Sequence, residues 1–360
     1  MAVVEPHATG RRLRNAVCIL LYLFSAQFAL IAFLQKPGNP HDFERARLPD
    51  LVNGTAHRPF VYRAAFPLAL RCAWQLIPDG LQVRLAQAAT DNRAIGYFFN
   101  STPADEDRDP VLYLIAYALE FVSLIAFAFL LRSMIRHFYD CDGWRADLLP
   151  IVALCGLPIF FRYISYDYDF PNLLIFTLGL FLLARRSWTS YFLWLPFCGL
   201  AKETALLLVV IHVLVGVSTM PRRSLVLNAL AQLAILGVVR GLLQFVVFRD
   251  NPGSPVEYWL DRNWAMITSV DQWGFLFFHF AWVGKTSLVI PTNYNLLFLI
   301  LLPLIFRRWS KQPIFLRRAF WIVPILTLLT MFFGYIDEMR AYYEAYPVVF
   351  LLASGTVCRR

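Results

Sequence analysis

Long runs of apolar residues alternate with short polar segments along most of this 360-residue chain. Residues 15–34 and 111–131 are the clearest runs. A helix of roughly 20 apolar residues crosses a bilayer, so each run predicts a membrane span. About ten spans fit the pattern. They lie near residues 14–35, 111–131, 148–165, 170–185, 188–200, 204–219, 224–248, 291–306, 319–335 and 344–357.

The stretch 188–219 is long for one span and short for two. Two short helices that meet at Ala201, Lys202, Glu203 and Thr204 fit it best, either as short spans or as a re-entrant pair. The sequence therefore predicts a break in the helical chain at this junction.

Basic residues gather at the ends of the apolar runs. Cytoplasmic loops carry an excess of Lys and Arg, so placing every cluster in the cytoplasm requires an even number of spans between successive clusters. The predicted spans meet this condition and put both termini in the cytoplasm. The clusters lie at 11–14, 132–145, 185–186, 222–223, 307–318 and 359–360. The first run is too long for a typical signal peptide and lacks a small-residue cleavage site, so we interpret it as a retained span.

Composition supports a membrane protein. Hydrophobic residues make up 59% of the chain and charged residues 16%, with a mean hydropathy of +0.55, whereas a soluble domain usually carries about 25% charged residues. The formal net charge of +9 comes from the loop clusters, so we expect no nucleic acid partner. The predicted fold class is all-α, a polytopic transmembrane helical bundle in the lipid bilayer, with residues 1–360 as a single integral membrane domain.

Two long segments lie outside the membrane in this topology. The first outer segment, residues 36–110, contains two stretches, 61–77 and 81–99, in which arginines punctuate an apolar surface. Amphipathic helices of this kind lie in the membrane interface, so we expect two interfacial helices. The second outer segment, residues 249–291, is rich in Trp and Tyr, as an interface belt is.

The six cysteines form no CxxC pair, and most lie in or beside apolar runs. We therefore expect buried free thiols rather than a disulfide framework or a zinc site. The chain also lacks GxxxxGK[ST], GxGxxG and HExxH motifs. ATP-driven transport by this chain alone and zinc proteolysis thus have no support.

Polar residues that an apolar bundle does not explain collect at the outer ends of the predicted helices. A bundle could gather these helix ends around one outward-facing cavity. The residues are His41, Asp42 and Glu44; Arg58 and Arg63; Asp167 and Asp169; Lys202 and Glu203; and Asp337, Glu338, Arg340 and Glu344.

Some of these groups have an equally good structural interpretation. Asp42 and Glu44 are as consistent with ordinary loop acids as with a general base above the first span. Asp337, Arg340 and Glu344 stand three and four residues apart, so a salt-bridge ladder on one helical face explains them as well as a binding site does.

For the other groups, the structural and functional interpretations are not equally good. Asp167 and Asp169 occupy a tight connection where helix caps are expected, and Asp caps helices well. Lys202 and Glu203 favour function, because a charged pair between Leu-rich helices is costly and usually pairs, lines a water cavity or binds a ligand. Arg240, deep in the seventh predicted span, must face protein or water, and its role could be purely structural.

The layout resembles the GT-C glycosyltransferases, multi-spanning enzymes that take sugars from polyprenyl-phosphate donors. The shared features are acids and then interfacial helices in the first outer segment, the junction at Lys202 and Glu203, and an acid and arginine cluster near the C-terminal end. The stretches 58–63 and 338–347 look like segments of uncharacterised membrane proteins of this kind. Many members have adjacent acids in the first loop, whereas residue 43 is Phe here and separates the two acids.

The resemblance implies transfer of a sugar from a polyprenyl-phosphate donor to a glycan, lipid or protein acceptor. Asp42 is the first choice and Glu44 the second for the base that deprotonates the acceptor hydroxyl. Lys202, Arg63 and Arg340 are candidates to stabilise charge on the departing phosphate. The expected substrate-binding residues are Arg58, Arg63, Asp167, Asp169, Lys202, Glu203, Asp337, Glu338, Arg340 and Glu344.

Two further roles follow from the same resemblance. Glu203 and Glu344 would orient the cations or bind acceptor hydroxyls. A divalent metal could assist through Asp42 and Asp169, although nothing in the sequence requires a cofactor.

Several alternatives stay open. A transporter or flippase for a lipid-linked or small polar substrate usually shows paired repeats and broken helices, and only one broken pair is evident here. A polysaccharide polymerase or ligase and a non-catalytic membrane subunit are also consistent with the sequence. The bacterial inner (plasma) membrane is the expected location. Sequons at Asn53 and Asn100 would be glycosylation acceptors in an endoplasmic reticulum lumen.

Overall fold

In a computed structural model of the chain, five helices are long and apolar enough to cross a membrane, counted within the described residues. The predicted helical membrane bundle is confirmed at this level. These helices cover Leu13–Leu34, Pro110–Phe138, Gly143–Phe160, Arg222–Val247 and Ile314–Phe333. The structure describes residues 6–34, 43–91, 109–141, 143–161, 166–269, 278–283, 286–291, 293–336 and 338–358.

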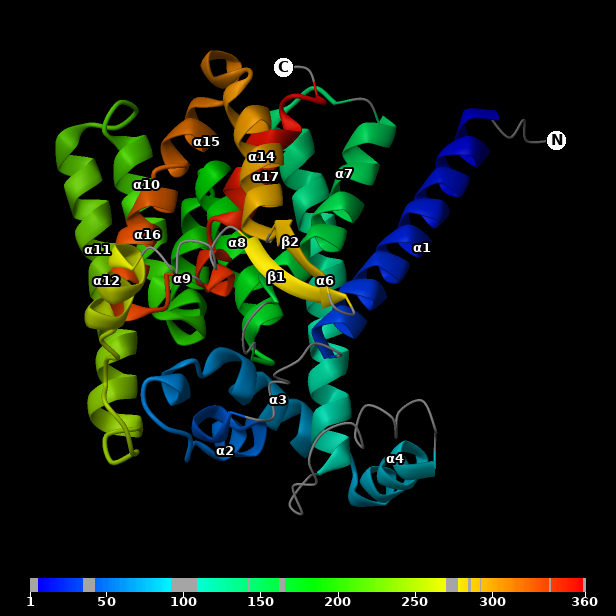
Figure 1. Cartoon of the computed structure of the whole chain (residues 1–360), viewed down its shortest axis with the longest axis vertical. Coiled ribbons are helices and arrows are strands. Elements are labelled where there is room, and N and C mark those ends of the chain that lie inside the picture. Colours follow the sequence, from blue (N-terminus) through cyan, green and yellow to red (C-terminus); the bar gives the residue numbers. More distant parts are fainter. Residues whose placement is uncertain are drawn as a thin grey trace.

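Each of the ten predicted spans overlaps a helix of the bundle (Figure 1). The bundle helices are α1 (Pro6–Leu34), α6 (Pro110–Phe138), α7 (Gly143–Gly156) with η4 (Leu157–Phe160), α8 (Asp169–Ala184), α9 (Trp188–Ala201), η5 (Glu203–Ala205), α10 (Leu206–Gly216), α11 (Arg222–Leu242) with the π-helical turn η6 (Leu243–Val247), α14 (Asn293–Phe306), η7 (Trp309–Lys311), α15 (Ile314–Ala319), α16 (Ile322–Phe333), η8 (Met339–Tyr342) and α17 (Tyr346–Ser354). Among them α8, α9, α10, α14 and α17 have 16, 14, 11, 14 and 9 residues. These are shorter than the roughly 20 residues of an independent span.

The main core joins α1 and α6–α10 to the C-terminal helices, with side chains such as Tyr22, Leu131 and Leu351 fully buried. Helices in lipid associate mainly through close packing and hydrogen bonds, which small residues at the contacts favour. Gly179 on α8 is one such residue, because a Cβ atom there would lie 2.9 Å from a methyl group of Leu208 on α10. The absence of a side chain at this position therefore allows the close approach of the two helices.

The first outer segment packs against one end of the bundle, below α9 and beside the lower end of α6 in Figure 1. Its core contains the buried Tyr62 and Leu70 together with Tyr113 of α6 and Tyr168. The predicted helix over 61–77 corresponds to η3 and α3, and of the predicted helix over 81–99 only α4 lies within the described residues. The elements are η2 (Glu44–Ala46), α2 (Leu48–Asn53), η3 (Phe60–Tyr62), α3 (Ala65–Gln75) and α4 (Asp79–Asp91).

The second outer segment contains a helix and a hairpin that the all-α prediction did not include. Helix α12 (Leu260–Thr268) is followed by antiparallel strands β1 (Phe278–Val283) and β2 (Thr286–Pro291), in a register that pairs Phe278 with Pro291 and Val283 with Thr286. Buried Asn263 attaches α12 to the end of α16. Its amide nitrogen donates to the carbonyl oxygens of residues 330, 331 and 334 at 3.2, 2.9 and 2.7 Å. Backbone groups that a helix end leaves unpaired are satisfied in this way.

The opposite end of the bundle is held by a buried acid. Asp147, at the start of α7, accepts hydrogen bonds from Arg132 and Arg136 of α6, each at 2.6 Å. The guanidinium Nε of Arg14 on α1 lies 3.4 Å from the other carboxylate oxygen. One carboxylate thus joins three helices, because a buried charge needs opposite charges close to it.

A disulfide between Cys141 and Cys358 lies at this same end, so the expectation that these thiols are free was wrong. The two residues are 217 positions apart, with Cα atoms separated by 4.8 Å. Sequence spacing does not reveal a contact of this range, because it depends on how α6 and α17 pack. The other four cysteines are free, and Cys18 and Cys198 are buried as expected.

Candidate functional site

The helical chain breaks at the predicted junction. Helix α9 ends at Ala201, and Lys202 has an extended backbone, with φ −162° and ψ 150°, before η5 begins at Glu203. The break gives the two neighbouring charged side chains different partners. The Lys202 ammonium lies 2.8 Å from Glu344, and Glu203 lies 3.1 Å from Arg63.

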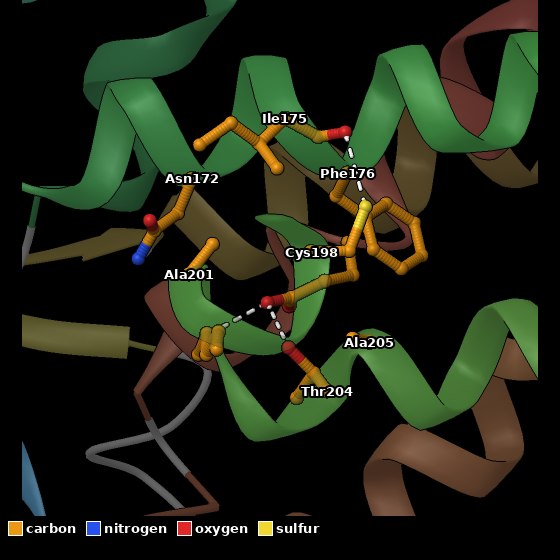
Figure 2. A pocket seen from close by; sticks show the side chains of 9 residues that line it. Asn172, Ile175, Phe176, Cys198, Ala201, Thr204 and Ala205 are labelled. Carbon is orange, nitrogen blue, oxygen red and sulfur yellow. Dashed lines mark hydrogen bonds and ion pairs between the residues drawn. The ribbon is translucent and has the colours of Figure 1, made fainter. Parts of the chain in front are cut away.

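Glu344 is the buried partner of the lysine. Its Oε1 also accepts a hydrogen bond of 2.6 Å from the Thr204 hydroxyl. Both contacts border the small pocket in Figure 2, which has room for about one water molecule. The pocket is lined by Asn172, Ile175, Phe176, Cys198, Ala201, Lys202, Thr204, Ala205 and Glu344.

Glu203 connects two arginines from distant parts of the chain. Arg63, from the first outer segment, also donates a hydrogen bond of 2.6 Å to the Tyr168 hydroxyl. Arg240 of α11 lies 3.6 Å from the second Glu203 oxygen, and its guanidinium stands 4.6 Å from the ring centre of Tyr62. Burial alone would lower the pKa of Arg63, but Tyr168 and Glu203 outweigh it and raise the pKa above the usual arginine value.

Arg340 forms the second half of the arrangement. It donates two hydrogen bonds to Glu338, at 2.9 and 2.6 Å, and its Nη1 lies 3.6 Å from Asp169. Asp169 also accepts a hydrogen bond of 3.0 Å from the backbone of Tyr166 in the turn before α8, whose N-cap is Tyr168. The rings of Tyr166 and Tyr168 stack with centres 5.1 Å apart, which links the Arg340 side to the Arg63 side.

We call this group the charged centre. Its four cations and four carboxylates balance, so an anionic ligand would compete with these carboxylates for the cations. The carboxylate best placed to give way is Glu203, whose side chain is 40% exposed, against 12% for Glu338 and 5% for Glu344. The centre consists of Arg63, Asp169, Lys202, Glu203, Arg240, Glu338, Arg340 and Glu344.

Other predicted site residues are not among the described members of the charged centre. Asp42 and Asp337 fall outside the described residues, as does His41. Glu44 is exposed on η2. Arg58 donates a hydrogen bond of 3.1 Å to the carbonyl of Arg249, and thereby joins the two outer segments rather than the charged centre.

Of the salt-bridge ladder considered near the C-terminal end, Arg340 and Glu344 have other partners, and Asp337 lies outside the described residues. Residues 339–342 form the 3-10 turn η8, not an α-helix, so the spacing of three and four residues does not define one face. Arg340 instead contacts Asp169, and Glu344 contacts Lys202.

Within the described residues, no group of three or more His, Cys, Asp or Glu side chains has the arrangement of a metal site. The metal considered for Asp42 and Asp169 includes a residue outside this part of the chain. By their chemistry, the cations of the charged centre can bind anions and its carboxylates can bind hydroxyl groups.

The sequence analysis did not predict that two buried acids lie close together. Glu120, on α6, and Asp167 are 0% and 3% exposed. Only Asp167 was named as a site residue. The sequence did contain a signal for Glu120, because an acid within an otherwise apolar span usually marks a functional site. Arg240 was recognised as an intramembrane charge, but the sequence did not predict that Glu203 is its partner.

Comparison with known proteins adds no relative: no family model, curated protein or solved structure matches this chain.

Proposed function

We propose that this chain is a membrane-embedded glycosyltransferase that moves a sugar from a polyprenyl-phosphate donor to a glycan, lipid or protein acceptor on the extracytoplasmic face. One observation carries the proposal. Arg63, Lys202, Glu203, Arg340 and Glu344, which come from three distant parts of the chain, meet in one centre beside the first outer segment.

The centre has the charges that such a transfer requires. Cleavage of the sugar–phosphate bond leaves negative charge on the phosphate, and preorganised cations stabilise that charge most in a site with little water. Arg63 and Arg240 share the half-buried Glu203, so a phosphate that displaced this carboxylate would meet two guanidiniums. Arginine binds phosphate through two parallel hydrogen bonds.

The acceptor hydroxyl needs a base. Asp42 is the proposed base and Glu44 the alternative, because both follow the first span and precede the segment that covers the centre. Glu344 and Glu203 are proposed to bind acceptor hydroxyls once the donor phosphate has taken their cations.

The membrane arrangement is part of the proposal. All ten helical segments enter the bilayer, the shorter ones as a packed group, with both termini in the cytoplasm of a bacterial cell and the outer segments on the other side. The basic clusters at the ends of the helices support this orientation.

The test is transfer by purified protein reconstituted with polyprenyl-phosphate sugars and a panel of acceptors. Lys202→Ala and Asp42→Asn are each expected to lower the rate by about 10²-fold or more, as loss of a charge-stabilising group or base does. Lys311→Ala, on η7 outside the charged centre, is the matched control and should retain the rate. Transfer that survives both site changes contradicts the assignment.

A transporter or flippase is the second candidate, favoured by the break at Lys202 with its buried partner Glu344. Discontinuous helices that expose charged or backbone groups are typical of transporters. Movement of a labelled substrate across vesicles, without transfer from any donor, would favour this candidate over the enzyme. A polysaccharide polymerase or ligase would instead give products of increasing length in the transfer assay.

A further inference from the structure

Glu120 is an isolated acid inside an apolar helix. It lies ten residues after the start of α6, about 15 Å along the helix. Its side chain is fully buried, and no donor among the described residues hydrogen-bonds to either carboxylate oxygen. A buried carboxylate without such partners is strongly disfavoured, and the usual outcome is that the group takes up a proton.

The neighbour of Glu120 is a second acid. Asp167, just before α8, is buried beside α6 as Glu120 is, and its Oδ1 also has no hydrogen-bond partner among the described residues. Ionised carboxylates only accept hydrogen bonds, so two of them can bond to each other only when one holds a proton. Two acids buried side by side without donors therefore favour a state in which they share a proton.

The groups around the pair do not neutralise it. Asp169 adds a third carboxylate, and Tyr343, just after η8, adds a neutral phenol. The nearest cation of the charged centre, Arg340, pairs with Asp169 and Glu338. No cation in the described part of the chain forms an ion pair with Glu120 or Asp167. Two charges on adjacent carboxyl groups cannot coexist there, and this is the situation in which one proton is shared.

We propose that Glu120 and Asp167 hold one proton between them and take up the proton released in the charged centre. The first half stands on the burial of the two acids and on their unpartnered oxygens, and the second rests on the proposed transferase function. Asp169 interacts with both the pair and Arg340, so the proposal places the pair next to the reaction and gives Asp167 a role in proton transfer instead of the substrate binding expected from the sequence.

The proton balance is simple. The acceptor oxygen bonds to the anomeric carbon, the bond from that carbon to the phosphate oxygen breaks, and its electron pair leaves with the phosphate. The hydroxyl proton goes first to the base and then to the pair, which passes from one proton to two and later releases one to water. Burial raises the pKa of Asp167 to about 7, so the second proton can be taken up and released near neutral pH.

Infrared spectroscopy of the purified full-length protein tests the shared proton without any substrate. At pH 7.5, wild type should show the carbonyl stretch of a buried protonated carboxyl group, which shifts in D₂O. Glu120→Gln and Asp167→Asn should each alter or remove this band. Asp261→Asn, at an exposed acid on α12, should leave it unchanged, and Glu120→Asp should restore a band. A wild-type spectrum without the band, or a band that both pair variants retain, overturns the proposal.

The pH profile of transfer tests the second half. Wild type should show a limb near pH 7 in kcat that moves in Asp167→Asn, whereas KM for the donor stays within about twofold, because the pair does not touch the substrate. An unmoved limb overturns the role in proton uptake. If no donor supports transfer, the proposed function fails, while the infrared result still decides whether the pair holds a proton.

Discussion

Charged residues form ion pairs at both ends of this bundle, but the two groups differ in the balance of charge. Asp147 is one buried carboxylate among three arginines, each of which holds a different part of α1 or α6 against α7. In the charged centre, cations and carboxylates are equal in number and exchange of partners is possible. The first arrangement favours stability, and the second favours binding.

Asp147→Asn is therefore expected to destabilise the protein strongly. Breaking a buried ion pair on one side typically costs about 3–5 kcal/mol, because the remaining charges stay without a counter-charge. Thermal unfolding in detergent measures the change, and Asp140→Asn, at an exposed acid seven residues earlier, should leave the unfolding temperature within error. Equal effects of the two variants would contradict the structural role of Asp147.

Asp167 gives stability a pH dependence with a defined sign. Its pKa of about 7 in the folded chain exceeds the ordinary value of about 3.9, so the folded state keeps a proton that the unfolded state has lost between these values. Stability from this group therefore falls as pH rises through that window, and the loss is complete above about pH 7. Asp167→Asn should show a smaller fall in unfolding temperature between pH 5 and 8. Parallel wild-type and variant curves would contradict it, and Asp261→Asn should follow wild type.

At the scale of elements, the apolar runs predicted where helices lie, because any backbone inside a bilayer must satisfy its own hydrogen bonds. The break at Lys202 was also predictable, since charged neighbours cannot continue an apolar helix without partners. The identity of each charged residue's partner was not predictable. Whether Glu203 meets Arg63, or Glu344 meets Lys202, depends on the rotation and depth of packed helices, which a single sequence does not encode locally. The hairpin of β1 and β2 lacked the alternating pattern that would have distinguished it from an aromatic interface belt.

The contact between α12 and α16 is expected to control the position of the segment that carries Arg340. Asn263→Ala removes the side-chain donor that three carbonyls at the end of α16 share, of which only that of Thr330 is fully buried and keeps a backbone donor, at a cost of about 1–3 kcal/mol. Hydrogen exchange should accelerate at Ile336, whose amide now bonds to Asn263 at 3.2 Å, and in the residues that follow it. Thr268→Ala, on the same helix with an exposed hydroxyl, is the control. Unchanged exchange at Ile336 would show that α12 does not hold this segment.

At the scale of the whole molecule, two features point to opposite orientations. Basic clusters favour the cytoplasm, whereas disulfides persist in oxidising compartments, and Cys141–Cys358 lies at the basic end. Cys72, the exposed free thiol of α3 in the first outer segment, can decide between them.

In the proposed orientation, a membrane-impermeant maleimide should label Cys72 in spheroplasts and not in inside-out vesicles. A Cys155→Ala background removes the other exposed free thiol, and Cys72→Ala provides the blank. Labelling from inside-out vesicles alone would reverse the orientation and put the disulfide on the outer side.

The Cys141–Cys358 bond also adds a covalent link between distant parts of the chain. It closes residues 141–358 into a covalent ring that includes every member of the charged centre except Arg63, which belongs to the preceding tail. A protease that cuts the exposed connection near Ser254 would open this ring without releasing a fragment. The nicked chain would migrate near full length on a gel without reductant and separate into two pieces once the disulfide was reduced.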